Sequence, residues 1–363
     1  MKRRASIILT LSLLLLGGCG GGSGEEENDN TPPPGEIAPD GEKYYYQQWY
    51  INHDEDFYES VGIDPKAGID ADYALSHYCG AGVRVAVIDD GLDMKHEDLA
   101  GALKASYDIV TGGSDVSHSN PWDYHGTAVS GLLSARINGK GIAGVAGCSE
   151  LIFLKYRENM SDSETIELFE KAREFGADIV LCSWGTYDVS EAVRDEIVDL
   201  ANNGREGRGI VVVFAAGNDD RYMGNDESAI PEVISVGASD IDNDRAWYSN
   251  YGRNLDILAP GGDYDHAITT LDDSGEDGCS TIDPDYLLYD DYYGFVGTSA
   301  SAAIVAGAVA LMLEKNPTLS RERIEDILKK SASKIGHLPY EDGRNDYYGY
   351  GKLDLDAAME MIP

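Results

Sequence analysis

Residues 295–310 of the chain read FVGTSASAAIVAGAVA, a stretch without a charged side chain in which small residues predominate. Leu311, Met312 and Leu313 follow it directly. A helix that is apolar on every side lies inside the core of a large domain, so the stretch predicts a buried helix. Near its start lies Ser299, where backbone N–H groups lack partners within the helix. This serine is either an N-cap residue of a packed helix or a nucleophile whose neighbouring amides can hold a developing oxyanion.

Short β-branched runs alternate with helical patterns on both sides of this stretch. The predicted strands are 83–88, 151–155, 178–183, 210–214, 233–236 and 255–258. The predicted helices are 69–77, 125–133, 164–175, 190–201 and 321–329. Such alternation predicts an α/β fold in which a mostly parallel central sheet is covered by helices on both faces, giving three layers. We assign this fold to one domain, residues 41–363.

Polar residues follow or straddle the carboxyl ends of three predicted strands. Asp89 follows the strand 83–88, Ser183-Trp184-Gly185 straddles the end of the strand 178–183, and Asn218 follows the strand 210–214. The carboxyl ends of parallel strands meet at one edge of a sheet, and functional groups gather there. We therefore expect these side chains to lie close together.

Asp89, His125 and Ser299 supply the three groups of a nucleophilic serine site. A serine hydroxyl becomes a good nucleophile when a histidine accepts its proton, and a buried carboxylate holds that histidine in one tautomer. Asn218 is the candidate side-chain donor to the oxyanion, beside the backbone N–H of Ser299. An α/β-hydrolase esterase is excluded because Ser299 lacks the Gly-x-Ser-x-Gly turn and the order of the three residues differs.

Six segments in this chain resemble the motifs of the subtilisin-like serine proteases, the subtilase or S8 type. They are VIDDG (87–91), HGT (125–127), SWG (183–185), AGN (216–218), APG (259–261) and GTSAS (297–301). The resemblance extends roughly from Gln47 to Ala358. It implies the subtilisin-like fold and an endopeptidase that hydrolyses protein or peptide substrates through an acyl-enzyme. A pseudoenzyme or binding protein on the same fold is the alternative, which the intact set of catalytic residues argues against.

Within that family the chain is most similar to the kexin and proprotein-convertase branch. Asp90 follows Asp89 where many relatives have threonine, and SWG (183–185) and QQWY (47–50) add to the likeness. The resemblance implies acidic pockets that prefer cleavage after basic residues; a broad subtilisin-like specificity is the alternative. The residues then expected to contact substrate are Asp90, Ser183, Trp184, Gly185 and Asp188, with Asp188 in the wall of the first pocket.

Three features depart from that branch. We expect no P domain, because the printed chain ends soon after Asp354, and no pro-domain of the usual size. Ala303 replaces a proline that is common in the serine motif, and alanine suits a helix.

The resemblance also implies a structural calcium ion. Asp98, Asn138 and Glu42 match positions of a calcium site in the family, with Asp40 as the alternative to Glu42. Calcium prefers hard oxygen ligands of this kind, and ligands from separate segments would tie the N-terminal arm to the domain. The alternative is that these are acidic surface residues without a metal.

The first 40 residues predict export. Residues 1–18 combine a basic start with a short apolar run, and Cys19 follows Leu-Gly-Gly, which resembles a bacterial lipoprotein signal with a lipidated cysteine. An ordinary secretory signal is the alternative. Residues 19–40 lack the apolar residues needed for packing and predict a flexible tether. We expect a chain anchored to the cell envelope by lipid, in the outer membrane if there are two membranes, because Gly20 is not an aspartate.

Charge and cysteine content set further limits. The net charge is −37, which argues against binding to nucleic acid or, by charge, to an anionic membrane. Besides Cys19 the chain has Cys79, Cys148, Cys182 and Cys279. An exported chain can form one or two disulfides from these four, and their pairing cannot be read from the sequence. Cys182 lies within an apolar strand pattern and is expected to be a buried free thiol.

Overall fold

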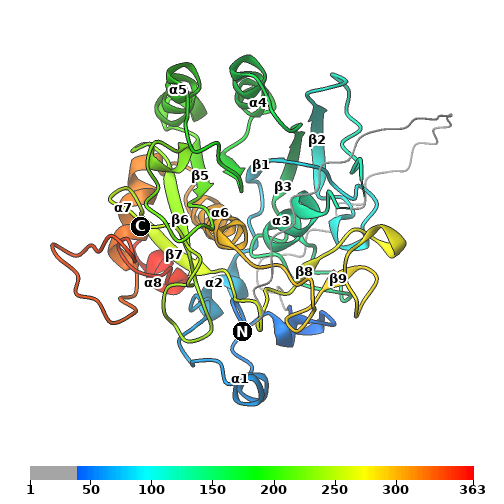
Figure 1. Ribbon diagram of the computed structural model, residues 1–363, viewed down its shortest axis with the longest axis vertical. Helices are drawn as coiled ribbons and strands as arrows, with labels where there is room; N and C mark the ends of the chain where they lie inside the picture. The colour runs from blue at the N-terminus through cyan, green and yellow to red at the C-terminus, as the bar shows by residue number, and fades with distance from the viewer. Residues whose placement is uncertain (1–38, 121) are drawn as a thin grey trace. The chain divides into compact units, whose positions relative to one another are not determined.

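Seven parallel strands form the central sheet of the protein in this computed structural model, which describes residues 39–120 and 122–363 (Figure 1). Their order across the sheet is β2-β3-β1-β4-β5-β6-β7, and each neighbouring pair is parallel. The strands are β1 (Arg84–Asp89), β2 (Leu103–Asp108), β3 (Glu150–Lys155), β4 (Ile179–Cys182), β5 (Val211–Ala215), β6 (Ile234–Ser239) and β7 (Ile257–Pro260). A separate antiparallel pair consists of β8 (Thr270–Leu271) and β9 (Tyr286–Leu287).

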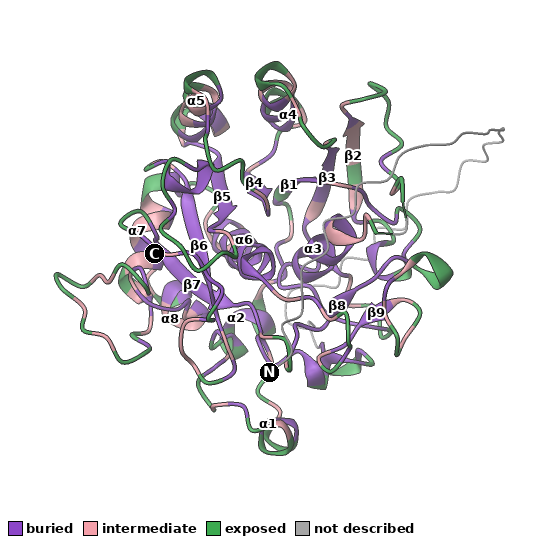
Figure 2. Cartoon of the chain, viewed as in Figure 1, coloured by how far each residue is buried: buried purple, intermediate pink, exposed green. Residues whose placement is uncertain are grey.

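Both faces of the central sheet are buried. Successive side chains of a strand point to opposite faces, so Val85 and Val87 of β1 join one hydrophobic core, whereas Ala86 and Ile88 join the other. The strands therefore read as continuous apolar runs instead of alternating ones. Figure 2 shows β5, β6 and β7 buried along their length.

Helices pack on each face of this sheet. The helices α4 (Asp162–Glu174) and α5 (Glu191–Gly207) cover one face, and both lie at the top of Figure 1. The core on the other face holds α3 and α6 together with smaller helices. Their bounds are α1 (Glu55–Val61), α2 (Asp72–His77), α3 (His125–Ser134), α6 (Thr298–Lys315), α7 (Arg321–Ser331) and α8 (Leu355–Glu360). The predicted three-layer α/β fold with a parallel sheet is confirmed.

The central helix α6 is buried over Thr298–Leu313, as the sequence predicts. Among the described residues it is the helix long and apolar enough to cross a membrane, but 89% of it is buried inside the domain. Small residues let α6 pack closely. At Gly307, for example, a Cβ would lie only 2.6 Å from the Cβ of Val145, which is too close for any residue but glycine. The helix begins directly before Ser299, which places this serine at the positive end of the helix dipole.

A disulfide joins Cys79 to Cys148 and so resolves the pairing that the sequence leaves open. The two cysteines precede the neighbouring strands β1 and β3, and the N–H of Cys148 donates to the carbonyl oxygen of Cys79 at 2.7 Å. A crosslink across 69 residues restricts the unfolded chain and favours the folded state. Cys182 and Cys279 are buried free thiols, and the prediction for Cys182 is confirmed.

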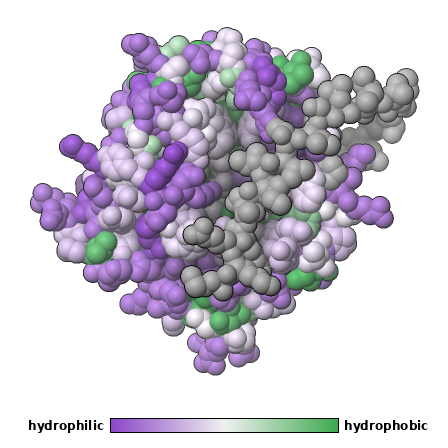
Figure 3. All heavy atoms as spheres, viewed as in Figure 1, coloured by the Kyte–Doolittle hydropathy of each residue, from purple (hydrophilic) through white to green (hydrophobic). Residues whose placement is uncertain are grey.

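The N-terminal arm packs into the domain from its first described residues onward. Trp49 and Tyr50 are buried, and the Gln48 carboxamide bonds to both the N–H and the carbonyl oxygen of Ala143. The predicted signal peptide (1–18), Cys19 and the tether up to residue 38 lie outside the described residues. The face of the described chain that is visible in Figure 3 is mostly hydrophilic, in keeping with the net charge of −37.

Candidate active site

Asp89, His125 and Ser299 form a continuous series of hydrogen-bonded side chains at the carboxyl edge of the sheet. His125 Nδ1 lies 2.8 Å from Asp89 Oδ1, and His125 Nε2 lies 3.0 Å from Ser299 Oγ. The three residues come from the end of β1, the first residue of α3 and the first turn of α6. The fold thus brings together three groups that are far apart in the sequence, in the arrangement that activates a serine.

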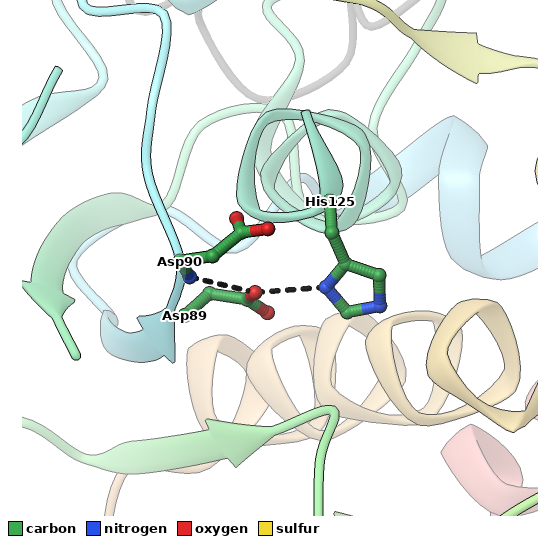
Figure 4. Close-up of side chains that lie close together, drawn as sticks. All are labelled: Asp89, Asp90 and His125. Atoms are coloured by element: carbon green, nitrogen blue, oxygen red, sulfur yellow. Dashed lines mark hydrogen bonds and ion pairs between the residues drawn. The ribbon is translucent and has the colours of Figure 1, made fainter. Parts of the chain in front are cut away.

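The two acidic residues beside His125 differ in their environment. Asp89 is fully buried, and its Oδ1 accepts from both His125 Nδ1 and the N–H of Asp90. The carboxylate of Asp90 accepts from the N–H of Gly126 at 2.9 Å. Figure 4 shows both carboxylates and the imidazole facing one another. Both acids therefore act on the same imidazole, Asp89 by contact and Asp90 by charge.

Their charges favour the imidazolium form of His125. Burial by itself lowers the pKa of His125, but the charge and hydrogen bond of Asp89 and the charge of Asp90 raise this pKa to about 9. Burial, followed by the charge of Asp89, raises the pKa of Asp90 to about 7. The imidazolium is the form that His125 takes when it accepts the proton of a serine, so the two carboxylates stabilise that step.

Asn218 is held against the start of α6 by its amide oxygen. Asn218 Oδ1 accepts from both the N–H and the hydroxyl of Thr298, each at 2.9 Å. These bonds orient the carboxamide and leave its Nδ2 hydrogens without a partner among the described residues. The Nδ2 group and the N–H of Ser299, which lies in the first turn of α6, can together donate to one substrate oxygen.

A cavity of about 310 Å³ adjoins the serine. Residues 183–185 and Tyr187 line it on one segment and residues 215–218 on another, and Asp226 also lines the cavity. Of the predicted substrate residues, Ser183, Trp184 and Gly185 line it as expected. A Cβ on Gly185 would lie 2.7 Å from Asp226 Oδ2, so only glycine lets the wall come so close to that carboxylate.

Asp188, predicted to wall the first pocket, is not among the residues that line this cavity. Asp188 is exposed, and its Oδ1 accepts from Asn225 Nδ2 at 3.0 Å. The chain turns just before Asp188, at Tyr187, whose φ of 65° lies in the left-handed region. Asp90 does not line the cavity either, although it lies beside His125.

Asp226 is the acidic residue that the sequence reasoning missed. It is 3% exposed and caps a short 3-10 helix, accepting from the N–H and hydroxyl of Ser228 and from the N–H of Tyr187. The run Asn-Asp-Glu at 225–227 follows Asn218 closely, but no local pattern shows that the chain folds back to the cavity there. Only the packing of this loop against the segment 185–188 reveals its position.

The residues proposed for calcium meet at the loop 138–142. The carboxylate of Asp98 accepts from Asn138 Nδ2 at 3.1 Å and from the N–H of Ile142, and the carboxylate of Glu42 accepts from the N–H groups of Gly139 and Lys140. Asp40, the alternative to Glu42, is exposed. Burial raises the pKa of both carboxyl groups, and the charge of Asp98 raises that of Glu42 further.

Comparison with known proteins relates this chain to one family. Residues 80–351 match the profile described as the Subtilase family. A calcium-dependent protease of Nostoc sp. is 30% identical over 345 residues, which cover 87% of this chain and 51% of that protein. The chain therefore spans about half the length of that relative. A subtilisin of Bacillus pumilus is 31% identical over 295 residues, which cover 78% of this chain and 93% of the subtilisin.

A solved structure extends the comparison to the fold. The serine protease of Aeromonas sobria, solved in complex with a chaperone, superposes with a TM-score of 0.78 at 24% identity, covering 90% of this chain and 67% of that one. At this identity the likeness concerns the architecture alone.

Proposed function

Because this chain belongs to the subtilase family, we propose that it is a serine endopeptidase that hydrolyses peptide bonds through an acyl-enzyme. The observation that carries the proposal is the unbroken series of hydrogen bonds from Asp89 through His125 to Ser299 beside a cavity. A binding protein on the same fold has no need of that series. Hydrolysis that disappears in a Ser299→Ala variant is the test.

The geometry supports one sequence of steps. The reacting form is the neutral imidazole of His125: its Nδ1–H donates a hydrogen bond to Asp89, so Nε2 carries the lone pair. Nε2 then takes the proton of Ser299 Oγ as this oxygen attacks the substrate carbonyl. The N–H of Ser299 and the Nδ2 group of Asn218 stabilise the oxyanion. His125 then protonates the leaving amine, and a water molecule hydrolyses the acyl-enzyme with His125 as base again.

For specificity we propose a preference for cleavage after a basic residue, with Asp226 as the group that recognises it. Asp226 is the acidic side chain that lines the cavity beside Ser299, whereas Asp188 lies outside it. A lysine or arginine side chain would form a charge-assisted hydrogen bond with a buried carboxylate. An apolar side chain would leave that carboxylate facing no cation, at a cost of roughly 1–3 kcal/mol. The alternative is a broad specificity in which Asp226 serves only as the cap of its short helix.

Asp226→Asn is expected to lower the ratio of kcat/KM for matched peptides with Arg and Leu before the cut by about five- to 150-fold. The reason is that asparagine keeps the shape and much of the capping capacity but removes the charge. The measurement compares both peptides at high salt, which screens attraction by the acidic surface. Asp188→Asn is the matched control and should leave the ratio within about twofold. Equal cleavage of both peptides by the wild type would establish the broad specificity instead.

We also propose that the family's calcium site is retained here. Glu42, Asp98 and Asn138 fit a calcium ion in chemistry, since they supply carboxylate and amide oxygens from three separate segments. Burial, and for Glu42 also the charge of Asp98, raises the pKa of these acids, and a divalent cation would favour their charged forms. The carboxamide of Asn138 would have to turn its oxygen toward the ion, because its Nδ2 now donates to Asp98. Bound there, calcium would link the N-terminal arm to the loop 138–142.

Removing calcium with EDTA is expected to lower the melting temperature of the protein, because a ligand held at 100 times its Kd stabilises by about 2.7 kcal/mol. Thermal denaturation with and without added Ca²⁺ measures the effect. Glu42→Gln should weaken the response to calcium, whereas Glu97→Gln, an exposed neighbour that pairs with Lys140, should not. A melting temperature that EDTA leaves unchanged would rule out the site.

Export and anchoring through a lipid on Cys19 complete the proposal. A disulfide such as Cys79–Cys148 forms in an oxidising compartment, which supports export. Two or more acyl chains on Cys19 would hold the protein stably at a membrane.

Cys19→Ser is expected to release active enzyme into the soluble fraction, because the acceptor of the lipid is lost. Cell fractionation with an activity assay measures this, and Cys279→Ser should stay with the membrane as the control. Membrane retention of the Cys19→Ser protein would show that a different anchor holds it.

A further inference from the structure

Tyr187 stands at the mouth of the cavity beside Ser299 in an unusual conformation. It lines the cavity, yet its side chain is 49% exposed. Its φ of 65° is in the left-handed region, which is uncommon for a residue as bulky as tyrosine. Such conformations persist where the surrounding structure enforces them, and they often mark functional positions.

Two buried acidic residues enforce this conformation. The N–H of Tyr187 donates to Asp226 Oδ2 at 2.8 Å. The N–H and hydroxyl of the preceding Thr186 donate to the carboxylate of Glu227 at 2.9 and 2.7 Å. Asp226 and Glu227 are 3% and 1% exposed, so the two acceptors are buried although Thr186 and Tyr187 lie at the surface. The backbone turn that aims the tyrosine is therefore rigidly held.

The side chain of Tyr187 then crosses to the opposite wall. Its hydroxyl donates to Asp219 Oδ2 at 2.9 Å, and Asp219 directly follows Asn218. The guanidinium of Arg221 lies 3.9 Å from the centre of the tyrosine ring and 3.5 Å from the Asp219 carboxylate. Tyr187 lines the cavity, whereas Asp219 and Arg221, which contact its hydroxyl and ring, do not.

We propose that Tyr187 is a specificity-determining residue that closes one side of the first substrate pocket, with Asp219 and Arg221 as positioning residues that hold its ring. The proposal rests on the proposed peptidase function. The hydrogen bond from Tyr187 to Asp219 holds the ring in place and so fixes the width of the pocket. The pocket accepts a long unbranched side chain, whose methylene groups lie along the ring, and it rejects a wide aromatic side chain. The class of substrate selected is therefore a peptide with lysine or arginine, not phenylalanine, before the cut.

The test measures the choice between peptides that differ only in Arg or Phe at that position, both by binding and by hydrolysis. Binding is measured on a Ser299→Ala background, where no hydrolysis interferes, and kcat/KM is measured on the active enzyme. Tyr187→Ala is expected to raise the preference for Phe relative to Arg by about tenfold, mainly through Kd and KM. Tyr222→Ala, which changes an exposed tyrosine on the loop that carries Asp219 and Arg221 and does not line the cavity, should not change it.

Tyr187→Phe keeps the ring and removes only its hydrogen bond, so it guards against a variant that fails to fold. It should give a smaller shift in the same direction, and Asp219→Ala, which removes the acceptor of that hydrogen bond, should give the same shift. Combining the changes at Tyr187 and Asp219 should shift the Arg-to-Phe ratio no further than either change alone, because both remove the same hydrogen bond. An unchanged Arg-to-Phe ratio in Tyr187→Ala, or the absence of peptide binding, would overturn the closed pocket. If the wild-type protein binds these peptides but does not hydrolyse them, the proposed function is overturned and the closed pocket is not.

Discussion

Ser299→Ala is expected to lower kcat by about 10⁶-fold, the scale seen when the serine or histidine of such a triad is removed from a subtilisin. The hydroxyl that lies 3.0 Å from His125 Nε2 is the proposed nucleophile, and alanine offers no replacement. His125→Ala should cost about as much, because without the base the hydroxyl stays protonated. Asp89→Asn should also be severely impaired, since asparagine favours the wrong tautomer of the imidazole. Single-turnover and steady-state hydrolysis of a peptide measure each loss.

The three residues are expected to act as a unit. A triple variant should be about as inactive as Ser299→Ala alone, because each single change already breaks the same series of hydrogen bonds. Ser301→Ala is a matched control: it removes a buried hydroxyl from the same helix that bonds to the carbonyl oxygens of Ala259 and Pro260 and not to Asp89, His125 or Ser299. Its activity should stay within a few-fold of the wild type. Losses that multiply across the three sites would contradict their action as a unit. Circular dichroism would show whether any variant is unfolded.

Asn218→Ala is expected to lower kcat by about 10²–10³-fold with little change in KM, which is the range reported for the equivalent donor in a subtilisin. The Nδ2 group serves the oxyanion, which exists only after attack, so the loss falls on the chemical step and not on substrate binding. Steady-state kinetics with one good peptide separate the two parameters. A change confined to KM would reject the role.

The amide oxygen of Asn218 needs its own control, because it also accepts from Thr298. Asn218→Asp keeps that acceptor and removes the Nδ2 donor, so it should lose activity at least as severely as Asn218→Ala. Its melting temperature should stay closer to that of the wild type, because the contact with Thr298 survives. Activity of Asn218→Asp near the wild-type level would show that the carboxamide positions the helix and does not stabilise the oxyanion.

Much of the fold is readable from the sequence because its determinants are local. The strands β1 and β5 are β-branched runs buried on both faces, and the amphipathic period of α4 and α7 appears in their sequences. The strand β2 was missed because it lies at the edge of the sheet and only one of its residues is buried, so its sequence lacks a continuous apolar run. Short helices such as α1 and α8 carry too few turns to show a period.

Asp89, His125, Ser299 and Asn218 could be named from the sequence alone, because each lies within a short motif at the end of a strand or the start of a helix. Only the tertiary structure decided that Asp226 and not Asp188 lines the cavity, that Glu42 bonds to the same loop 138–142 as Asp98, and that Cys79 pairs with Cys148. The physical reason is the same in each case. Side chains carried by loops are placed by hydrogen bonds to distant backbone groups, as at Tyr187, and such bonds leave no period and no motif in the sequence that makes them.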